Sequence, residues 1–392
     1  MKRTGKFFPK LISNMAVDSF DEILKQRLLK KGTNHRELKN IETYKPTHLQ
    51  IKSGDTKKGL INFASNDYLG LSEHQLQVHL SSQPSSRLLS GNLEMHTYIE
   101  NEIAEWLGYE DSITFATGYM ANLGLLSCIA IKGDTLLLDK HCHASLIDGA
   151  KLSEADFKRF NHLDYNHLEK LLQQNGSKGT QWVVTESLFS MGGDLPDVKR
   201  LKELKDKYHF KLIVDEAHGI GVYGDKGKGW FSEFYKPSEL IDIFIFNFSK
   251  AFALQGGAVA GSQVLKEYIV NRCRTFIYTT ATPAYQLEHI PLRLKQIQAA
   301  DEDRKKLKQL CLSLQQLIGL TRPWSPIIPY HIGDGLKTLN LSKHIFEKGF
   351  YCPAILPPTV RVNEARLRIS LNSKHEQHEI EALMQCLKQS DV

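Results

Sequence analysis

A lysine in the second half of the chain stands in a setting that suits covalent chemistry. Lys250 follows the apolar run at residues 243–246 and precedes the small-residue stretch at residues 256–261. A lysine near a strand end is usually a surface charge whose stem lies on apolar neighbours. Small residues nearby, however, allow a ligand to approach closely. In that setting a lysine can form a Schiff base with a carbonyl compound.

Asp215 comes one predicted strand earlier and ends a run, residues 211–214, that would otherwise be buried. An unpaired carboxylate is costly to bury. The simplest interpretation is a helix N-cap at Asp215. The alternative is that Asp215 pairs with the protonated nitrogen of a pyridine ring, which would keep the ring cationic and make it a better electron sink. From these residues alone both interpretations stay open.

Other polar or small residues also follow short apolar runs. The runs are residues 113–116, 135–138, 182–185, 211–214 and 241–246. The residues that follow them are Gly118, His143, residues 186–190, Asp215 with His218, and Ser249 with Lys250. Ligands of an open parallel sheet bind outside the carboxyl ends of its strands. We therefore expect these side chains to converge on one crevice.

Gly118 lies in Thr117-Gly118-Tyr119, between a predicted strand and a predicted helix. Free backbone N–H groups at the start of a helix can bind a phosphate. The segment matches neither GxGxxG nor GxxxxGK, which favours a single phosphate over a dinucleotide or ATP.

The elements that must position these residues indicate an α/β fold. Short runs of β-formers separated by stretches of helical length predict a mostly parallel sheet with helices on both faces. After about Pro283 we expect a long amphipathic helix through residues 302–304, and then a smaller α+β unit that ends with a helix at residues 376–388. The predicted organisation is an N-terminal arm at residues 1–58, with a polar helix at residues 18–31, a large domain at residues 59–285 and a small C-terminal domain at residues 286–392.

Composition limits the class of protein. With 392 residues, 41% hydrophobic and 24% charged, the chain can bury a sizeable core. Its formal charge of +6 is modest and its basic residues alternate with acids, which argues against nucleic acid and suits an anionic substrate. No segment approaches the roughly 20 apolar residues of a membrane helix, and only a short apolar stretch follows the basic start. We therefore expect a soluble, cytoplasmic protein without a membrane partner.

The cysteines and histidines give no sign of a metal site. The six cysteines are far apart and show no CxxC spacing, which argues against a disulfide framework and a zinc site. His141-Cys142-His143 has no distant cluster of partner ligands. We expect no metal.

Six segments together resemble the α-oxoamine synthases, and the resemblance is colinear from about Asn62 to about Lys374. The segments are SNDYLGL at residues 65–71, TGYMAN at 117–122, HASLIDG at 143–149, TESLFSMGGD at 185–194, DEAHG at 215–219 and Ser249-Lys250. Members of this family are fold-type I pyridoxal-phosphate (PLP) enzymes that join an amino acid to an acyl thioester with loss of CO2. The resemblance implies a PLP-dependent acyltransferase, and a homodimer with active sites at the subunit interface.

The resemblance also implies roles for individual residues. Lys250 would hold PLP as a Schiff base and then remove the α-proton of the amino acid, Asp215 would bind the pyridinium nitrogen, and His143 would stack on the ring. Further cofactor contacts would come from Gly118, Tyr119, Ser190, His218, Asn247 and, in the neighbouring subunit, Thr280. Arg368, with Asn66 nearby, would bind the substrate carboxylate, and Arg36 and Thr359 would line the substrate channel.

The chain departs from the family pattern at three places. Asn247 replaces the usual threonine three residues before the lysine, although an amide can still donate a hydrogen bond. The family's glycine-rich stretch near the active-site mouth is Gln83-Pro84-Ser85-Ser86-Arg87 here, after a shorter preceding segment. Arg361 stands where the pattern usually has proline.

Within the family, three segments favour the branch that condenses L-alanine with a pimeloyl thioester in biotin synthesis. They are LPPTV at residues 356–360, ARLR at 365–368 and RFNHLD at 159–164. The acyl group could be carried on coenzyme A or on an acyl carrier protein, and the sequence leaves this open. The altered segment at residues 83–86 keeps a second hypothesis alive: another branch that uses glycine or serine, resembling 2-amino-3-ketobutyrate CoA ligase, or that makes a long-chain aminoketone. A third hypothesis is a PLP-binding protein that has lost catalysis.

Overall fold

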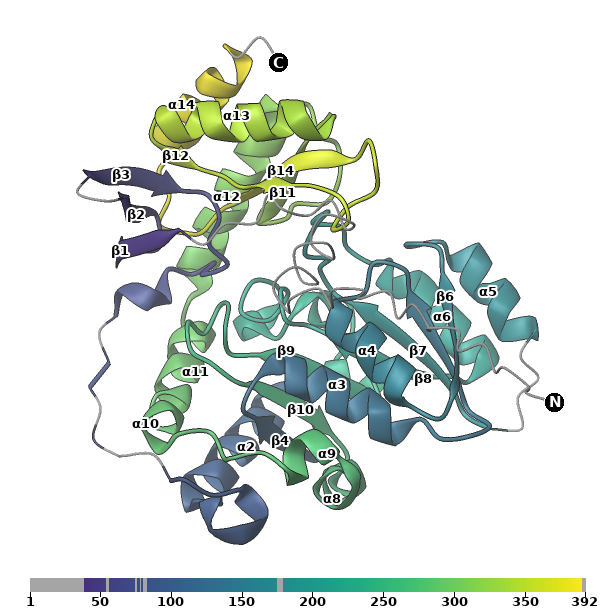
Figure 1. Cartoon of the computed structure of the whole chain (residues 1–392). Helices are drawn as coiled ribbons and strands as arrows, with labels where there is room; N and C mark the ends of the chain where they lie inside the picture. The colour runs from purple at the N-terminus through teal and green to yellow at the C-terminus, as the bar shows by residue number, and fades with distance from the viewer. Residues whose placement is uncertain are drawn as a thin grey trace, which may run out of the picture.

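A seven-stranded sheet forms the centre of the larger part of the molecule (Figure 1). The computed structural model describes residues 39–53, 56–74, 76–77, 79, 83–174 and 179–389. The strand order is β4-β10-β9-β8-β7-β5-β6. The strands are β4 (Asp111–Phe115), β5 (Thr135–Asp139), β6 (Asp156–Phe160), β7 (Gln181–Glu186), β8 (Lys211–Asp215), β9 (Ile243–Asn247) and β10 (Gly257–Gly261). The pairs from β6 to β9 are parallel, and β10 is antiparallel to both of its neighbours. The predicted mostly parallel sheet is confirmed.

Helices cover both faces of this sheet. One face packs against α3 (Gly118–Ile129), α4 (Ala144–Leu152), α8 (Gln263–Arg272) and α9 (Arg274–Ile277). The other packs against α2 (Glu94–Leu107), α5 (Tyr165–Gln174), α6 (Val198–Tyr208) and α11 (Ile290–Gln298). Neighbouring residues of β8 illustrate the period of two, because Leu212 and Val214 belong to one core and Ile213 to the other. Burial on both faces explains why the central strands read as continuous apolar runs.

Short elements connect the strands and helices of this layered part. They are η1 (Leu71–Glu73), η2 (Arg87–Gly91), η3 (Asp225–Gly227), η4 (Trp230–Glu233), α7 (Pro237–Leu240) and α10 (Ala284–Leu287). The long amphipathic helix expected through residues 302–304 is α12 (Asp301–Leu317), and the two shorter helices α10 and α11 precede it. Among the described residues, no helix has the length and apolar character needed to span a membrane.

A smaller C-terminal unit has its own sheet and core. Its strands lie in the order β11-β14-β13, with β11 (Ile327–Gly333), β13 (Ala354–Ile355) and β14 (Ala365–Ser370). Helices α12, α13 (Gly335–Glu347) and α14 (Gln377–Lys388) pack around a core that includes Leu341, Leu367 and Ile380. Figure 1 shows this unit above the edge of the large sheet.

The described residues before position 63 form a sheet that joins this C-terminal unit. It contains β1 (Asn40–Tyr44), β2 (His48–Ser53) and β3 (Thr56–Asn62), and β3 pairs in parallel with β12 (Phe350–Tyr351). The boundary expected between residues 58 and 59 therefore falls inside β3. The helix expected at residues 18–31 and the candidate Arg36 lie outside the described residues.

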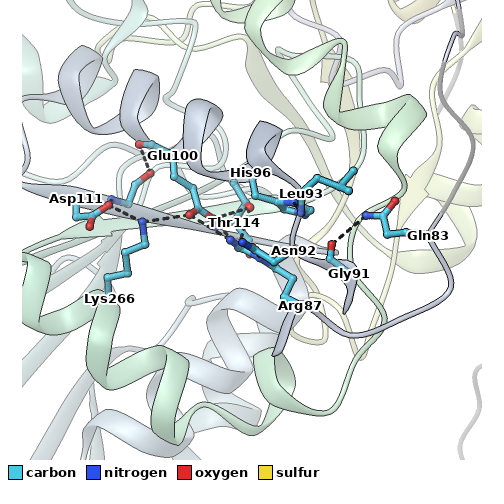
Figure 2. A network of polar contacts seen from close by, with 11 residues as sticks. Gln83, Arg87, Gly91, Asn92, Leu93, His96, Glu100, Asp111, Thr114 and Lys266 are labelled. Carbon is cyan, nitrogen blue, oxygen red and sulfur yellow. Dashed lines mark hydrogen bonds and ion pairs between the residues drawn. The ribbon is translucent and has the colours of Figure 1, made fainter. Parts of the chain in front are cut away.

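A buried ionic network fixes the segment that includes η2 to the outer end of the large sheet (Figure 2). The Arg87 guanidinium pairs with Glu100 of α2 at 2.5 Å, and Lys266 of α8 reaches the same carboxylate at 3.1 Å. Glu100 is 1% exposed and also accepts hydrogen bonds from the backbone and hydroxyl of Thr114 in β4. Burial raises the pKa of Glu100, but Arg87 and Lys266 outweigh it and hold that pKa below its ordinary value. The segment is thus tied to two helices and a strand.

Candidate active site

A cavity lies at the carboxyl edge of the large sheet, where β7, β8 and β9 end. Seven residues to which the sequence assigned a role line it: Gly118, Tyr119, His143, Asp215, His218, Asn247 and Lys250. Asn122, Ser145, Glu186 and Ala217 complete the lining. An adjoining hollow adds Thr117, Ser249, Gln255 and Gly256. Side chains expected to converge from different strand ends therefore do lie around one cavity.

Asp215 stands at the end of β8 and is 6% exposed. One carboxylate oxygen accepts the Ala217 N–H at 2.9 Å, and the other accepts the Asn122 side-chain N–H at 2.7 Å. Residues 217–222 form turns, so the N-cap interpretation of Asp215 is wrong. Each carboxylate oxygen has a second lone pair, so Asp215 can still accept a hydrogen bond from a cationic group in the cavity.

Lys250 follows β9 and lines both hollows. Within the described part of the chain, its amine makes no hydrogen bond. Burial lowers the pKa of Lys250, and Arg368 lowers it further, whereas Asp215 and Glu186 oppose the shift. A lowered pKa raises the fraction of neutral amine, which is the nucleophilic form.

His143 caps the N-terminus of α4. Its Nδ1 accepts the backbone N–H of Ser145 at 3.3 Å, and its own backbone N–H donates to the buried carboxyl group of Glu186. Its ring meets the Tyr119 ring edge-on, with centroids 6.1 Å apart. Burial lowers the pKa of His143 and Lys250 adds to this, although Asp215 acts in the opposite direction. The imidazole is therefore neutral at physiological pH.

His218 comes three residues after Asp215 and is 6% exposed. Its Nδ1 lies 2.7 Å from the hydroxyl oxygen of Tyr68. Burial lowers the pKa of His218 well below its ordinary value, with contributions from Lys250 and Arg368. The ring is thus neutral, and Nε2 is the nitrogen left for a ligand.

The N-terminus of α3 forms a cradle that a phosphate group would fit. Thr117 caps the Met120 N–H, while the N–H groups of Gly118 and Tyr119 belong to the first turn, which has no partner within the helix. A Cβ on Gly118 would lie 2.7 Å from Cβ of Asn247, so only glycine permits this approach. Asn247 accepts the N–H and hydroxyl of Ser249 through Oδ1, which leaves Nδ2 as a donor. Such a helix start favours an anion.

Arg368 of β14 and its partner Asn66 do not line either hollow, but the charge of Arg368 acts on Lys250 and His218 of the cavity. Its guanidinium donates to the Ser190 carbonyl oxygen at 2.5 Å, to the Ser370 hydroxyl at 2.6 Å and to Oδ1 of Asn66 at 3.0 Å. A guanidinium has five N–H groups. Three take part in the hydrogen bonds above, which leaves one on each terminal nitrogen, near the Tyr68 hydroxyl with which Arg368 also interacts. That pair can bind a carboxylate.

Three further residues predicted from the sequence, Ser190, Thr280 and Thr359, do not line the cavity either. Ser190 contributes its carbonyl oxygen to Arg368. Thr280 is exposed and pairs through its backbone with Ser86, and Thr359 is exposed in the segment between β13 and β14. Arg36 lies outside the described residues.

Three polar residues of the cavity were given no role from the sequence: Asn122, Ser145 and Glu186. Glu186 carried a usable signal, because it ends a buried run as Asp215 does. Asn122 is the fifth residue of α3 and Ser145 the second of α4, and nothing in their local sequence predicts that they meet. Among the described residues, no group of three or more histidine, cysteine, aspartate or glutamate side chains could hold a metal ion.

Comparison with known proteins agrees with this geometry. The family model described as aminotransferase class I and II matches residues 58–387. The 8-amino-7-oxononanoate synthase of Hydrogenovibrio crunogenus is 40% identical over 345 residues, which cover 84% of this chain and 87% of the relative. The solved structure of 8-amino-7-oxononanoate synthase from Francisella tularensis has a TM-score of 0.73 and 28% identity, and covers 84% of this chain and 97% of its own. A structure of SPT with PLP has a TM-score of 0.83 and 26% identity, over 94% and 96% of the two chains.

Proposed function

The chain belongs to the class I and II aminotransferase family and, within it, to the 8-amino-7-oxononanoate synthases, and we propose that the cavity around Lys250 carries out their reaction. The protein is a PLP-dependent acyltransferase of biotin biosynthesis. It condenses L-alanine with a pimeloyl thioester, and the products are 8-amino-7-oxononanoate, CO2 and the free thiol. The observation that carries the proposal is that Lys250, Asp215 and His143 line one cavity in a chain so similar to these synthases.

Different residues of the cavity would hold different groups of PLP. The first turn of α3 and the Asn247 amide would hold the phosphate, Asp215 the ring nitrogen and His143 one ring face. His218 would contact the ring hydroxyl through Nε2, since Tyr68 holds its other nitrogen. Ser190 would assist with its own hydroxyl, which has no partner among the described residues. When bound, PLP supplies a carbonyl group that condenses with an amine and a cationic ring that stabilises negative charge on the adjoining carbon.

Lys250 would act twice. As a neutral amine it would hold the cofactor, and once alanine has displaced it, Nζ would remove the proton from Cα of alanine. The lowered pKa of Lys250 supports this use, because a base must be unprotonated near neutral pH.

Arg368 would bind the alanine carboxylate through its two remaining N–H groups. Asn66, Ser190 and Ser370 already hold the guanidinium in place, so little rotamer freedom is lost when the substrate binds. Thr359 and Arg36 are the weaker candidates, and we assign them to the channel for the acyl chain.

We also propose a homodimer in which Thr280 of the partner subunit reaches the cofactor phosphate. Thr280 lies beside exposed apolar side chains, since Tyr278 is 72% exposed and Leu89 of η2 is 84% exposed. A second copy of the chain would remove this apolar surface from water. All six cysteines are free, which suits a reducing cytoplasm.

A second candidate is a different acyl transfer within the same family. The structure of SPT with PLP matches 94% of this chain, whereas the Francisella tularensis synthase structure matches 84%. SPT is a serine palmitoyltransferase. That similarity favours serine and a long unbranched acyl thioester as the substrates to test against alanine and the pimeloyl group.

The experiment measures CO2 and free thiol released by purified protein loaded with PLP. L-alanine, glycine and L-serine are each paired with pimeloyl-CoA, pimeloyl carrier protein and palmitoyl-CoA. The proposal expects the highest kcat/KM for alanine with a pimeloyl donor, and the two pimeloyl donors decide between coenzyme A and the carrier. Lys250→Ala should abolish release, while Lys132→Ala, an exposed lysine outside the site, should not. A preference for serine with palmitoyl-CoA would establish the second candidate. No release from any pair would leave a PLP-binding protein without catalysis.

A further inference from the structure

A continuous series of hydrogen bonds along the wall of the cavity joins Asp215 to His143. The Asn122 side-chain nitrogen donates to Asp215 at 2.7 Å and to the Ser145 hydroxyl oxygen at 3.0 Å. That hydroxyl lies 2.7 Å from Nδ1 of His143. The two middle residues come from different helices, α3 and α4, and their roles in the site were not evident from the sequence.

The chemistry of the groups fixes the direction of the two hydrogen bonds that Asn122 makes. A carboxylate can only accept, so Asn122 must turn its NH2 group toward Asp215. Both protons of that NH2 group are then used, one by Asp215 and one by Ser145. The Ser145 oxygen therefore accepts from Asn122, and its own proton is available to Nδ1 of His143.

The backbone of α4 gives an independent reason for the same proton arrangement. Nδ1 of His143 also accepts the backbone N–H of Ser145 at 3.3 Å, as the cap of the helix. A protonated Nδ1 could accept neither bond. In the neutral ring the proton must then reside on Nε2.

The residues that connect Asp215 to His143 through hydrogen bonds are buried, so their side chains are held in fixed positions. Asn122 is 4% exposed and Ser145 is fully buried. Oδ1 of Asn122 is buried and has no hydrogen-bond partner within the described residues. An unpaired buried carbonyl oxygen costs stability. The amide nevertheless keeps the orientation that serves Asp215 and Ser145.

We propose that Asn122 and Ser145 are positioning residues that hold His143 in its Nε2–H tautomer and fix the orientation of the Asp215 side chain, and so orient both contacts to the cofactor ring. That His143 and Asp215 contact a cofactor ring rests on the proposed function. A neutral imidazole can stack on a cationic pyridine ring, whereas an imidazolium would repel it.

The titratable groups around His143 come from several elements of the fold. Asp215 and Lys250 belong to β8 and to the segment after β9, Asp148 belongs to α4, and Glu186 at the end of β7 holds the His143 backbone. Tyr119 of α3 donates to Asp148 at 2.5 Å and meets the His143 ring. None of these groups donates a hydrogen bond to Nδ1, so the tautomer depends on Ser145.

The test uses nitrogen NMR of PLP-free full-length protein with 15N-labelled histidine rings, and the His143 signals are assigned from a His143→Gln spectrum. In the wild type we expect a protonated Nε2 and an unprotonated Nδ1. In Ser145→Ala and in Asn122→Leu the Nε2–H preference should weaken, and the pKa of His143 should rise by about 0.5 to 1 unit, as expected for one lost hydrogen bond. Ser153→Ala is the matched control, because its hydroxyl donates to Ala150 at the other end of α4.

Two results would overturn the proposal. One is a wild-type His143 protonated on Nδ1, which requires no variant. The other is an unchanged tautomer and pKa in both folded variants. Because the protein contains no cofactor in this experiment, the result is separate from turnover. The expected tautomer without acyl transfer rejects only the proposed function, and acyl transfer with the opposite tautomer rejects only this inference.

Discussion

Glu186 and Asp215 are direct register partners at the ends of β7 and β8, so two buried carboxyl groups lie side by side at the edge of the cavity. They differ in their hydrogen bonds. Asp215 accepts from Asn122 and Ala217, whereas Glu186 accepts from the backbone of His143. Burial raises the pKa of Glu186 well above its ordinary value, and Asp215 adds to the shift. Burial beside Asp215 therefore favours the neutral form of Glu186.

Glu186→Gln tests whether the Glu186 side chain is neutral in the folded protein. A glutamine keeps an oxygen that can accept the His143 N–H and is neutral, as Glu186 is, so kcat should stay within about threefold of wild type. Because folding raises the pKa of Glu186, ionising it in the folded protein becomes costly as the pH rises above its unfolded value of 4.5. The free energy of unfolding of the wild type, relative to Glu186→Gln, should thus decrease from pH 5 to pH 8.

The comparison needs an exposed glutamate as its control. Glu203→Gln on α6 should show no such pH trend, since Glu203 is exposed in the folded protein. A loss of activity in Glu186→Gln as complete as that in Lys250→Ala would mean that Glu186 works as a carboxylate.

The sheet shows how far local sequence patterns reach. Five apolar runs predicted β4, β5, β7, β8 and β9, because strands buried on both faces are apolar throughout. β10 was not predicted as a strand, since its sequence GAVAG consists of small residues. β6 was missed for another reason: it is an edge strand with four exposed residues out of five, so no apolar run marks it.

Some residues of the site could likewise be predicted from the sequence, whereas others could not. Gly118, Asp215 and Lys250 were predictable because strand ends of a parallel sheet meet at one edge. The contact between Asn122 and Ser145 depends on how α3 and α4 pack against each other, and the chain separates the two residues by 23 positions. The anchoring of Arg368 by Asn66 spans 302 positions. Contacts of that kind come from tertiary packing, and no local pattern encodes them.

Asn247 offers a test of the phosphate cradle. Asn247→Ala removes the free Nδ2 donor and should raise the dissociation constant of PLP about tenfold, the effect of one hydrogen bond to an anion. Asn247→Thr supplies a hydroxyl and should bind PLP within about threefold of the wild type. Equilibrium binding of PLP to cofactor-free protein is the measurement. Asn271→Ala on the exposed surface of α8 is the control, and equal affinity in Asn247→Ala would place the phosphate elsewhere.

Arg368→Gln should affect the amino acid more than the acyl donor. The change removes the charge and the two N–H groups left for a carboxylate, so kcat/KM for L-alanine should decrease by about 10² to 10³. The KM for the pimeloyl thioester should change little. Steady-state kinetics with each substrate varied in turn measures the difference. Arg366→Gln is a matched control, because Arg366 is a buried arginine of the same strand that pairs with Glu364. Equal losses in both variants would indicate damage to β14 and not to carboxylate binding.

Glu100→Gln probes the network that holds the segment around η2. Glu100 is 1% exposed and faces both Arg87 and Lys266, so neutralising it leaves Arg87 without its anion and Lys266 with Asp111 alone. Breaking a buried pair in this way typically costs about 3 to 5 kcal/mol of the free energy of unfolding. Because folding lowers the pKa of Glu100, the wild type should lose this contribution as the pH falls below the unfolded value of 4.5 and through the folded one. Chemical denaturation at pH 7 and at acidic pH measures the difference, which should shrink in acid.

Glu105→Gln on the exposed face of the same helix should change stability by less than about 0.5 kcal/mol. A Glu100→Gln protein as stable as this control would mean that Arg87 does not need the Glu100 charge and that Asp111 suffices for Lys266.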